Sequence, residues 1–328
     1  MVNIDKVVKD IKSIKIQGAT NIAKAAIGAL LDFSKSFEAS KNFGAPHGES
    51  FVFLREAEIN ANKLAWARPD EPLSQNLLNL IMARLEKDRN KDMKEKVANF
   101  QKSCQEALGL ISKNEQLITA SGISLLKKIY QKKKKPVLVF THCNSSSVVR
   151  ILISAHKAGA PLKVYNSETR PLYQGRIMAK ALSKAGIKTT MMIDNVAPFV
   201  ISKNDPDKIN IDLVIIGADV VGLDGSVLNK IGSYSLASVA KETGIPFYSA
   251  ASLLKARKDI DSYRKIKIER RDPKEVWAEL NKNVKVLNYA FDTVPPEYIS
   301  GLITEFGILK SKDVKMAAMK NYKEVFKK

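Results

Sequence analysis

Short apolar runs alternate with helical stretches through the second half of the chain, and this alternation restricts the fold more than any other feature. The runs are rich in β-branched and aromatic residues. They are PVLVF from Pro136, LKVYNS from Leu162, KTTMMI from Lys188, DLVIIG from Asp212, PFYSA from Pro246 and KVLNYA from Lys285. Helical spacing lies between them, for example over 174–185 and 234–243. The pattern predicts an α/β fold, a mostly parallel sheet with helices on both faces.

The first part of the chain is typical of helices instead. Apolar residues recur there at helical spacing. The predicted helices cover 21–33, 51–67, 73–85, 92–111 and 118–130. Arg68-Pro69 ends the second of them, because a residue before proline disfavours the helical conformation. We therefore expect a helical N-terminal domain over 1–130 and an α/β domain over 131–328.

The length of the chain, 328 residues, suits two domains.

The net charge of the chain has two explanations. A net charge of +20 favours nucleic acid or phosphorylated metabolites. However, the lysines are spread along the chain, and no RRM or KH signature is present. A lysine-rich solvated surface is therefore the favoured explanation of the net charge.

Cysteine and histidine usage predicts neither a metal site nor a cofactor. The two cysteines, Cys104 and Cys143, and three histidines form no metal-ligand pattern. No apolar run approaches the roughly 20 residues of a membrane span. The N-terminus is charged from the start and lacks the apolar region of a signal peptide. These features predict a reduced, cytoplasmic protein that does not enter a membrane.

Polar residues follow three of the predicted strands. Thr141–Asn144 come after the first strand, Ser167–Pro171 after the second, and Gly217–Asp219 after the run LVII. Further along, Asn229 to Gly232 are expected to open another helix. The carboxyl ends of parallel strands lie at one edge of a sheet, so we expect these groups to converge in one cleft.

A thiol and a carboxylic acid are the reactive groups of this predicted cleft. Cys143 lies between a strand end and a helix N-terminus, where helix N–H groups lower a thiol's pKa. With Asp219 and nearby basic residues, it suits proton transfer on a phosphorylated substrate. A cysteine protease fits less well, because His142 should point to the opposite face of the strand.

Each of these residues also has a purely structural explanation. Cys143 can be a small buried hydrophobic residue. Asp219 can cap a turn. Arg170 can pair with Glu168, and Lys230 can be a solvated residue. The shared sheet edge is what favours a functional site.

Several spaced motifs resemble one superfamily. They are THCNSS from Thr141, ETRPLYQGR from Glu168, GADVV from Gly217, GSVLNKIG from Gly225 and FDTVPPEYISGLITEFG from Phe291. The superfamily unites ribose-1,5-bisphosphate isomerase, 5-methylthioribose-1-phosphate isomerase and the alpha, beta and delta subunits of eukaryotic initiation factor 2B. In the helical part, IQGATNIAKAA from Ile16 and ARPDEPLSQNLL from Ala67 look like the family's two substrate loops. Motifs in the right order are more specific than any one alone.

The resemblance implies an activity, an assembly and a catalytic pair. It implies a helical domain on a Rossmann-like domain, and a homodimer or homohexamer. Cys143 and Asp219 match the catalytic cysteine and aspartate of the isomerases. Both positions are replaced in the exchange-factor alpha subunit, so an enzyme is favoured over a regulatory subunit. The alternative is a non-catalytic factor with a translation initiation factor as partner.

The resemblance also implies substrate-binding residues. Matching positions are Gln17, Gly18, Ala19, Arg68, Arg170, Asn229, Lys230 and Lys255. Both isomerases usually have arginine where this chain has Gln17. The neutral side chain should weaken phosphate binding by about 1.5–3 kcal/mol, unless another cation such as Lys24 compensates.

The expected reaction is an aldose–ketose isomerisation through an enol phosphate, with Cys143 as base and Asp219 as acid. THCNSSSVV lacks the glycine-containing form typical of the methylthioribose enzymes, and the helical domain is short. Both points favour ribose 1,5-bisphosphate, and hence archaeal-type nucleotide salvage and AMP metabolism, over 5-methylthioribose 1-phosphate.

Overall fold

The computed structural model describes residues 3–40, 48–260, 262–266, 268–279, 281 and 283–326. The chain forms two compact units, residues 1–113 with 319–328 and residues 114–318. The division falls inside the long helix α5 (Met93–Lys133). The domain boundary expected after residue 130 stays a prediction; the compact units divide earlier along the same helix.

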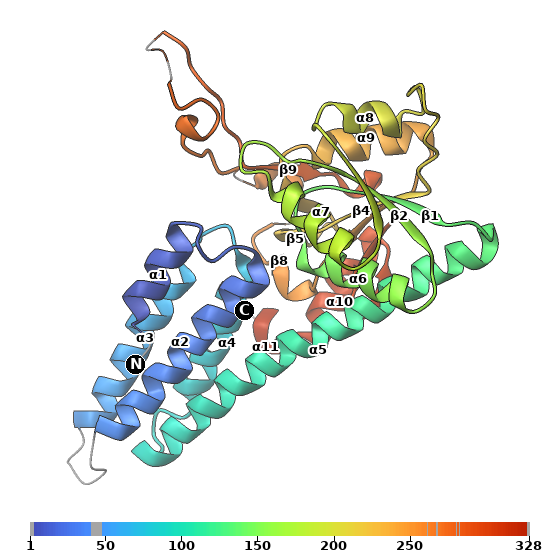
Figure 1. Cartoon of the computed structure of the whole chain (residues 1–328). Helices are drawn as coiled ribbons and strands as arrows, with labels where there is room; N and C mark the ends of the chain where they lie inside the picture. The colour runs from blue at the N-terminus through green and yellow to red at the C-terminus, as the bar shows by residue number, and fades with distance from the viewer. Residues whose placement is uncertain are drawn as a thin grey trace. The chain divides into compact units, whose positions relative to one another are not determined.

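The first unit is helical (Figure 1). It contains α1 (Ile4–Lys12), α2 (Ala19–Ser40), α3 (Gly48–Ala65), α4 (Pro72–Lys87), the first part of α5, and α11 (Lys323–Phe326). The predicted helices over 21–33, 51–67 and 73–85 are confirmed as α2, α3 and α4. The predicted break between 111 and 118 is wrong, because α5 runs through it. Residues 112–117 contain neither proline nor glycine to end a helix.

An aromatic cluster lies in the core of the helical unit. Phe53 of α3 is fully buried and stacks on Phe33 of α2 with ring centroids 5.8 Å apart. It also meets the edge of Phe100 of α5 at 5.5 Å and lies 5.1 Å from Phe37 of α2. Aromatic pairs in these geometries add to the free energy of burying their surface.

The second unit is built on a seven-stranded sheet in the order β11-β10-β7-β4-β1-β2-β3. Its strands are β1 (Val137–Thr141), β2 (Leu162–Ser167), β3 (Lys188–Met192), β4 (Leu213–Ile216), β7 (Phe247–Ala250), β10 (Gly301–Thr304) and β11 (Gly307–Leu309). Neighbouring strands pair in parallel, apart from the antiparallel β10 and β11. The predicted α/β fold with a mostly parallel sheet is confirmed.

Helices and a second sheet complete this unit. The helices are α6 (Ser146–Lys157), α7 (Gln174–Lys184), α8 (Val196–Ile201), α9 (Ser233–Thr243) and most of α10 (Val314–Asn321). The second sheet has the order β8-β5-β6-β9, with β8 (Ala256–Arg257), β5 (Val220–Gly222), β6 (Val227–Lys230) and β9 (Phe291–Val294). The sequence did not predict it. The run KVLNYA is not a strand, since within it only an isolated bridge joins Tyr289 to Arg270.

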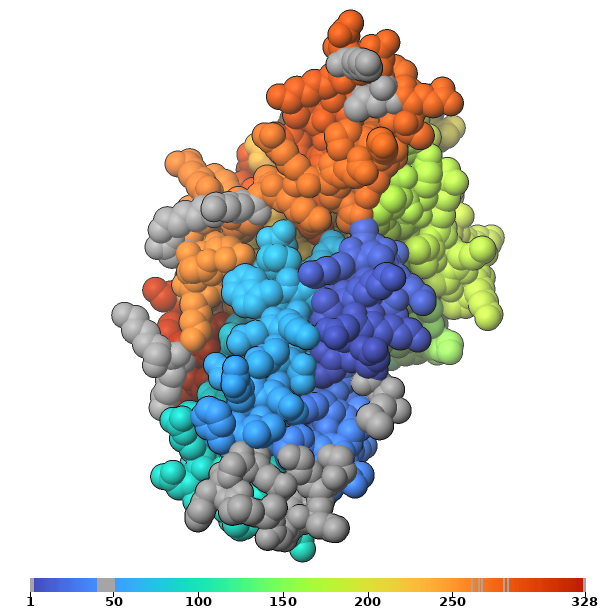
Figure 2. Space-filling model, turned by 90° about the vertical axis from the view of Figure 1, so that its left-hand side faces the viewer, coloured from blue at the N-terminus to red at the C-terminus, as the bar shows by residue number. Residues whose placement is uncertain are grey.

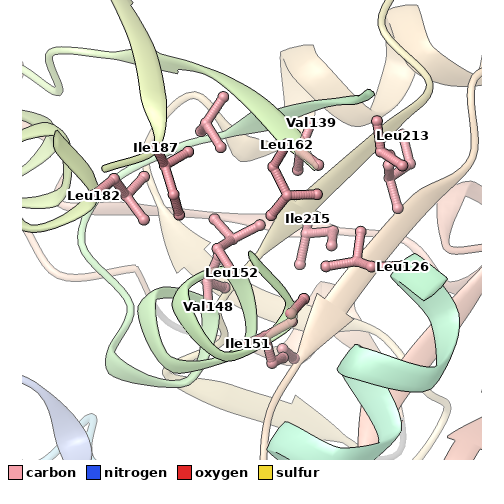
Figure 3. Packing of buried hydrophobic residues seen from close by; sticks show 14 of the residues in the cluster. Leu126, Val139, Val148, Ile151, Leu152, Leu162, Leu182, Ile187, Leu213 and Ile215 are labelled. Carbon is pink, nitrogen blue, oxygen red and sulfur yellow. The ribbon is translucent and has the colours of Figure 1, made fainter. Parts of the chain in front are cut away.

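The core of the α/β unit lies between the large sheet and its helices (Figure 3). Val139 and Ile215 of the central strands face Ile151 of α6, and Leu126 of α5 packs into the same cluster. Gly122 explains how α5 approaches α6 closely, since a Cβ there would lie 2.6 Å from Ile151. This packing fixes the central strands and the loops that follow them.

The strand order creates a switch point in the middle of the sheet. From β1 the chain adds β2 and β3 on one side, whereas β4, β7 and β10 extend the other side. The loops that leave β1 and β4 therefore diverge in opposite directions. In open α/β sheets, ligands bind in the crevice that forms at such a point.

The described residues between β8 and β9 (orange in Figures 1 and 2) are mostly exposed or half-buried. Arg271 pairs with Glu275 at 2.7 Å, and Asn288 donates to the carbonyl of Asp272. These contacts hold the base of the segment. Among the described helices, none combines the length and the apolar composition that crossing a bilayer requires.

Candidate active site

Cys143 lies at the switch point, directly beyond β1. Its φ of +65° is in the left-handed region, which is uncommon for a residue other than glycine. Its backbone N–H donates to the Thr169 hydroxyl at 3.1 Å. Ser145 then caps α6 by accepting from the N–H of Val148. The strand end, the turn and the helix cap together give the thiol a defined place at the sheet edge.

The prediction of a lowered pKa for Cys143 is wrong, although a hydrogen bond from the Asn144 backbone does lower it. Burial raises the pKa of the Cys143 thiol to about 11, outweighing the opposite effect of the Lys230 ammonium. The carboxylates of Asp219 and Asp194 raise it further. The resting thiol is therefore neutral near pH 7.

Asp219 follows β4, the strand next to β1. Its backbone N–H donates to the carbonyl of Leu228 at 2.9 Å, which ties it to β6. Lys255, at the end of a short 3₁₀ helix, donates to the carbonyl of Ala218 at 2.6 Å. The negative charge of Asp219 acts on the thiol of Cys143. The two predicted catalytic groups thus follow two parallel strands that are neighbours in the sheet.

Asn229 and Lys230 end strand β6, so the prediction that they open a helix is wrong; α9 begins only at Ser233. Both are buried. The Asn229 side chain donates to the hydroxyl of Ser233 at 2.9 Å, and the Lys230 ammonium lies 4.8 Å from the centre of the Phe291 ring. The electrons of an aromatic face attract a cation held over it. The charge of Lys230 acts on Cys143, so the structure brings these residues together.

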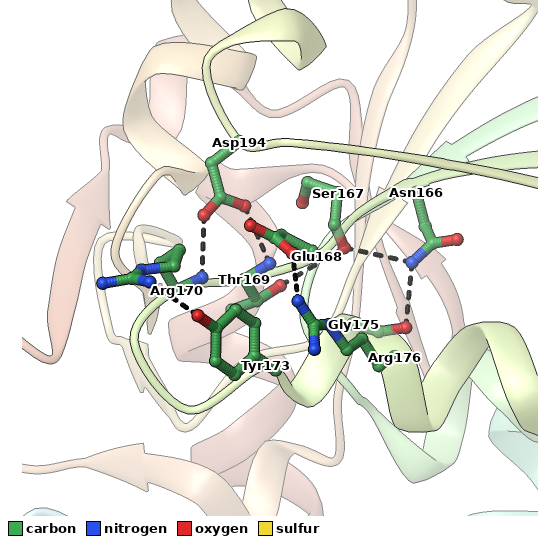
Figure 4. Close-up of polar contacts among 9 residues, drawn as sticks. All are labelled: Asn166, Ser167, Glu168, Thr169, Arg170, Tyr173, Gly175, Arg176 and Asp194. Atoms are coloured by element: carbon green, nitrogen blue, oxygen red, sulfur yellow. Dashed lines mark hydrogen bonds and ion pairs between the residues drawn. The ribbon is translucent and has the colours of Figure 1, made fainter. Parts of the chain in front are cut away.

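Arg170 lies on the loop after β2 (Figure 4). Its exposed guanidinium donates to the Tyr173 hydroxyl at 2.5 Å and to the carbonyl of Val276 at 3.4 Å. The pairing of Arg170 with Glu168 is not found; Arg176 takes that role at 2.8 Å. Arg170 therefore keeps a cationic group at the surface of the sheet edge.

His142 is buried beside the thiol. Its Nε2–H donates to the carbonyl of Ile231 at 2.8 Å, and its Nδ1 accepts from the Ser167 hydroxyl at 2.5 Å. A carbonyl can only accept, which fixes this tautomer. Burial lowers the pKa of His142, so the ring is neutral. Both ring nitrogens are used, which disfavours His142 as the base of a protease.

Asp194 is a residue that the sequence analysis missed. It follows β3, and both of its carboxylate oxygens accept from backbone N–H groups of the loop after β2 (Figure 4). The N–H of Thr169 donates at 2.8 Å and that of Arg170 at 2.7 Å. A signal was present, because Asp194 follows the predicted strand KTTMMI as the other site residues follow theirs.

The remaining predicted residues belong to the helical unit. Gln17 is exposed, and its carbonyl accepts from the side chain of Asn21 at 3.0 Å. Gly18 has a φ of +82°, and Ala19 begins α2. Arg68 lies between α3 and α4. Their role in binding substrate stays a prediction.

The arrangement offers a thiol, a carboxyl group and several cations, which is suited to proton transfer on an anionic molecule. Within the residues that the structure describes, no three His, Cys, Asp or Glu side chains gather as a metal site would require. The expectation of a reaction without metal or cofactor stays a prediction.

The fold and the site define an α/β protein with a helical unit and a thiol–carboxyl pair at the switch point of its sheet. Comparison with known proteins places it more narrowly. The chain belongs to the Initiation factor 2 subunit family, whose model matches residues 15–311.

Two kinds of isomerase are similar to the chain over most of its length. Ribose 1,5-bisphosphate isomerase of Archaeoglobus fulgidus is 30% identical over 91% of this chain and 87% of that protein. Methylthioribose-1-phosphate isomerase of Carboxydothermus hydrogenoformans is 32% identical over 93% and 87%. Among solved structures, 5-methylthioribose 1-phosphate isomerase of Pyrococcus horikoshii matches with a TM-score of 0.77 at 26% identity, covering 97% of this chain and 88% of that one.

Proposed function

We propose that the protein is a sugar-phosphate isomerase that converts ribose 1,5-bisphosphate to ribulose 1,5-bisphosphate. The observation that carries the proposal is the placement of Cys143 and Asp219 after β1 and β4, the strands on either side of the switch point. The relatives named above, isomerases of two sugar phosphates, support the same class of reaction.

The reaction begins with acid catalysis. In an aldose 1-phosphate the anomeric oxygen carries the phosphate, so simple ring opening gives no free aldehyde. The Asp219 carboxylate must first take up a proton; in this protonated form it donates the proton to the ring oxygen, and the bond between that oxygen and C1 breaks. The backbone hydrogen bond to Leu228 and the Lys255 contact with the Ala218 carbonyl hold the acid in place.

The base then moves a proton from C2 to C1. The thiolate of Cys143 removes the C2 proton, which gives an enol phosphate, and returns it to C1. The O2 hydroxyl gives its proton to the Asp219 carboxylate, leaving a ketone at C2 and restoring the acid. Burial raises the pKa of Cys143 to about 11, so only a small fraction of the protein carries the thiolate near pH 7, and this fraction is the active one.

The distribution of cations favours the bisphosphate. Lys230 acts on the thiol, whereas Arg170 stands exposed on another loop of the α/β unit. Two cationic positions suit two phosphates, and a guanidinium can bind a phosphate through two hydrogen bonds. We assign Asn229, which precedes Lys230 in β6, to a sugar hydroxyl. The second candidate substrate, 5-methylthioribose 1-phosphate, would need an apolar pocket for its methylthio group instead.

The same proposal covers location and assembly. We expect a cytoplasmic homodimer or homohexamer that acts in archaeal-type nucleotide salvage, without metal or cofactor. The competing proposal is a non-catalytic regulatory subunit that binds a translation initiation factor. The description of the matching family, Initiation factor 2 subunit, supports this competing proposal.

A turnover assay tests the function. Purified protein is offered ribose 1,5-bisphosphate and, separately, 5-methylthioribose 1-phosphate, and ketose formation is followed by NMR. We expect turnover of the first. Turnover of the second alone would keep the mechanism and overturn the substrate. A folded protein that turns over neither, but binds a translation initiation factor, would replace the enzyme with the regulatory subunit.

A further inference from the structure

Two backbone turns face each other beside the thiol, and one hydrogen bond joins them. Cys143 and Thr169 both have a φ of +65°. The N–H of Cys143 donates to the Thr169 hydroxyl at 3.1 Å, and this hydroxyl donates to the carbonyl of Ser167 at 3.5 Å. Thr169 is a buried β-branched residue, for which the left-handed region is a rare conformation. Such turns persist only where the surroundings hold them.

Asp194 is the group that holds the second turn. Its two carboxylate oxygens accept from the N–H groups of Thr169 and Arg170 at 2.8 and 2.7 Å (Figure 4). Charge-assisted hydrogen bonds to backbone N–H groups are stronger than neutral ones. Asp194 itself comes from the loop after β3, so the contact ties the ends of three neighbouring strands together.

We propose that Asp194 is a positioning residue for the Cys143 thiol, acting through the Thr169 hydroxyl, in the proton transfer proposed above. The chain of contacts runs from the Asp194 carboxylate to the Thr169 backbone, and from the Thr169 side chain to the Cys143 backbone. It fixes the turn that sets the direction of the thiol. The inference rests on the proposed function for its effect on turnover, but the positioning itself is measurable without substrate.

Two variants interrupt the chain at different links. Asp194→Asn keeps the shape of the side chain but leaves a single oxygen acceptor, so one backbone N–H loses its partner. Thr169→Val removes the acceptor of the Cys143 N–H without changing charge. Thr169→Ser retains the hydroxyl and serves as the conservative rescue. Asp207→Asn is the matched control, because Asp207 is exposed.

Each variant is assayed for turnover and for the rate at which iodoacetamide alkylates Cys143, followed by peptide mass spectrometry. Cys104 is fully buried and is the internal reporter of unfolding. We expect kcat to fall about 10- to 100-fold in Asp194→Asn and Thr169→Val, with KM nearly unchanged. We expect Cys143 to be alkylated at least about threefold faster, because the loosened turn exposes it. Thr169→Ser should retain most of the turnover and the slow alkylation.

The proposal is overturned if iodoacetamide alkylates Cys143 in both interrupting variants at the rate seen in the parent protein. It is also overturned if Cys104 becomes modified in step with Cys143, because the residues would then be merely structural. A parent protein without turnover would remove the proposed function alone, and the alkylation rates would still decide the positioning role.

Discussion

The helical unit and the sheet edge of the α/β unit are stabilised in different ways. In the helical unit, rings of Phe33, Phe37, Phe53 and Phe100 pack directly against one another. At the sheet edge, the His142 ring donates to a backbone carbonyl, and the Thr169 hydroxyl and the Asp194 carboxylate accept from backbone N–H groups of the left-handed turns. A change in the phenylalanine cluster should alter stability without touching the reactive groups. A change in the hydrogen bonds of the sheet edge should also alter the position of the Cys143 thiol.

The largest expected effect tests the packed region. Phe53→Ala should lower the free energy of unfolding by about 3–5 kcal/mol, because it leaves a cavity inside the aromatic cluster. Phe51→Ala, in the same helix but 60% exposed, is the matched control and should change it little. Chemical denaturation measures both. The comparison fails if the two variants are equally stable.

The stability of the folded protein should depend on pH through the titration of Asp292 in the α/β unit. Burial raises the pKa of Asp292 to about 6, although its carboxylate accepts from the N–H groups of Gly232 and Tyr234. Because this pKa is higher in the folded than in the unfolded state, Asp292 stabilises the folded protein below about pH 4, relative to high pH. That stabilisation is lost as the pH rises through 6. The full effect is about 3 kcal/mol.

The pH dependence is measured by denaturation of the parent and of Asp292→Asn at pH 4, 5, 6 and 7. The stability of the parent relative to the variant should decrease across this range. A constant difference in stability would mean that the pKa of Asp292 is the same in the folded and unfolded states, which would contradict the effect of burial.

Removing the cation next to the thiol should weaken substrate binding. Lys230→Gln loses one charge-assisted contact to phosphate, worth about 1.5–3 kcal/mol, so KM for ribose 1,5-bisphosphate should rise by at least tenfold. Lys241→Gln, at an exposed position of α9, is the control. Equal KM values for the two variants would remove Lys230 from the binding site.

The sequence predicted the parts of the site that depend on local pattern. An apolar run followed by polar residues placed Cys143 and Asp219 at strand ends, and the structure confirms those positions. The order of the strands is not a local property, so the switch point between β1 and β4 appeared only in the structure. Asp194 also follows a predicted strand, but its role depends on the pairing of β2 with β3, which the local pattern does not give.

Other errors also have a physical cause. The sign of the pKa shift of Cys143 was wrong because burial, a result of tertiary packing, outweighs the helix N-terminus. Asn229 and Lys230 were expected in a helix, but antiparallel pairing with β9 makes them a strand. Tertiary context overrides local propensity most easily in such short segments.

A matched pair of cysteine variants tests the central claim most directly. Cys143→Ser and Cys104→Ser each replace one sulfur by oxygen, the first at the sheet edge and the second in α5, where burial raises the pKa of Cys104 to about 12. Turnover of ribose 1,5-bisphosphate is measured for both. We predict that Cys143→Ser loses about 10²- to 10⁴-fold in kcat, the contribution of a positioned base, while Cys104→Ser keeps the parent value. Equal turnover in the two variants would contradict the assignment of Cys143 as the base.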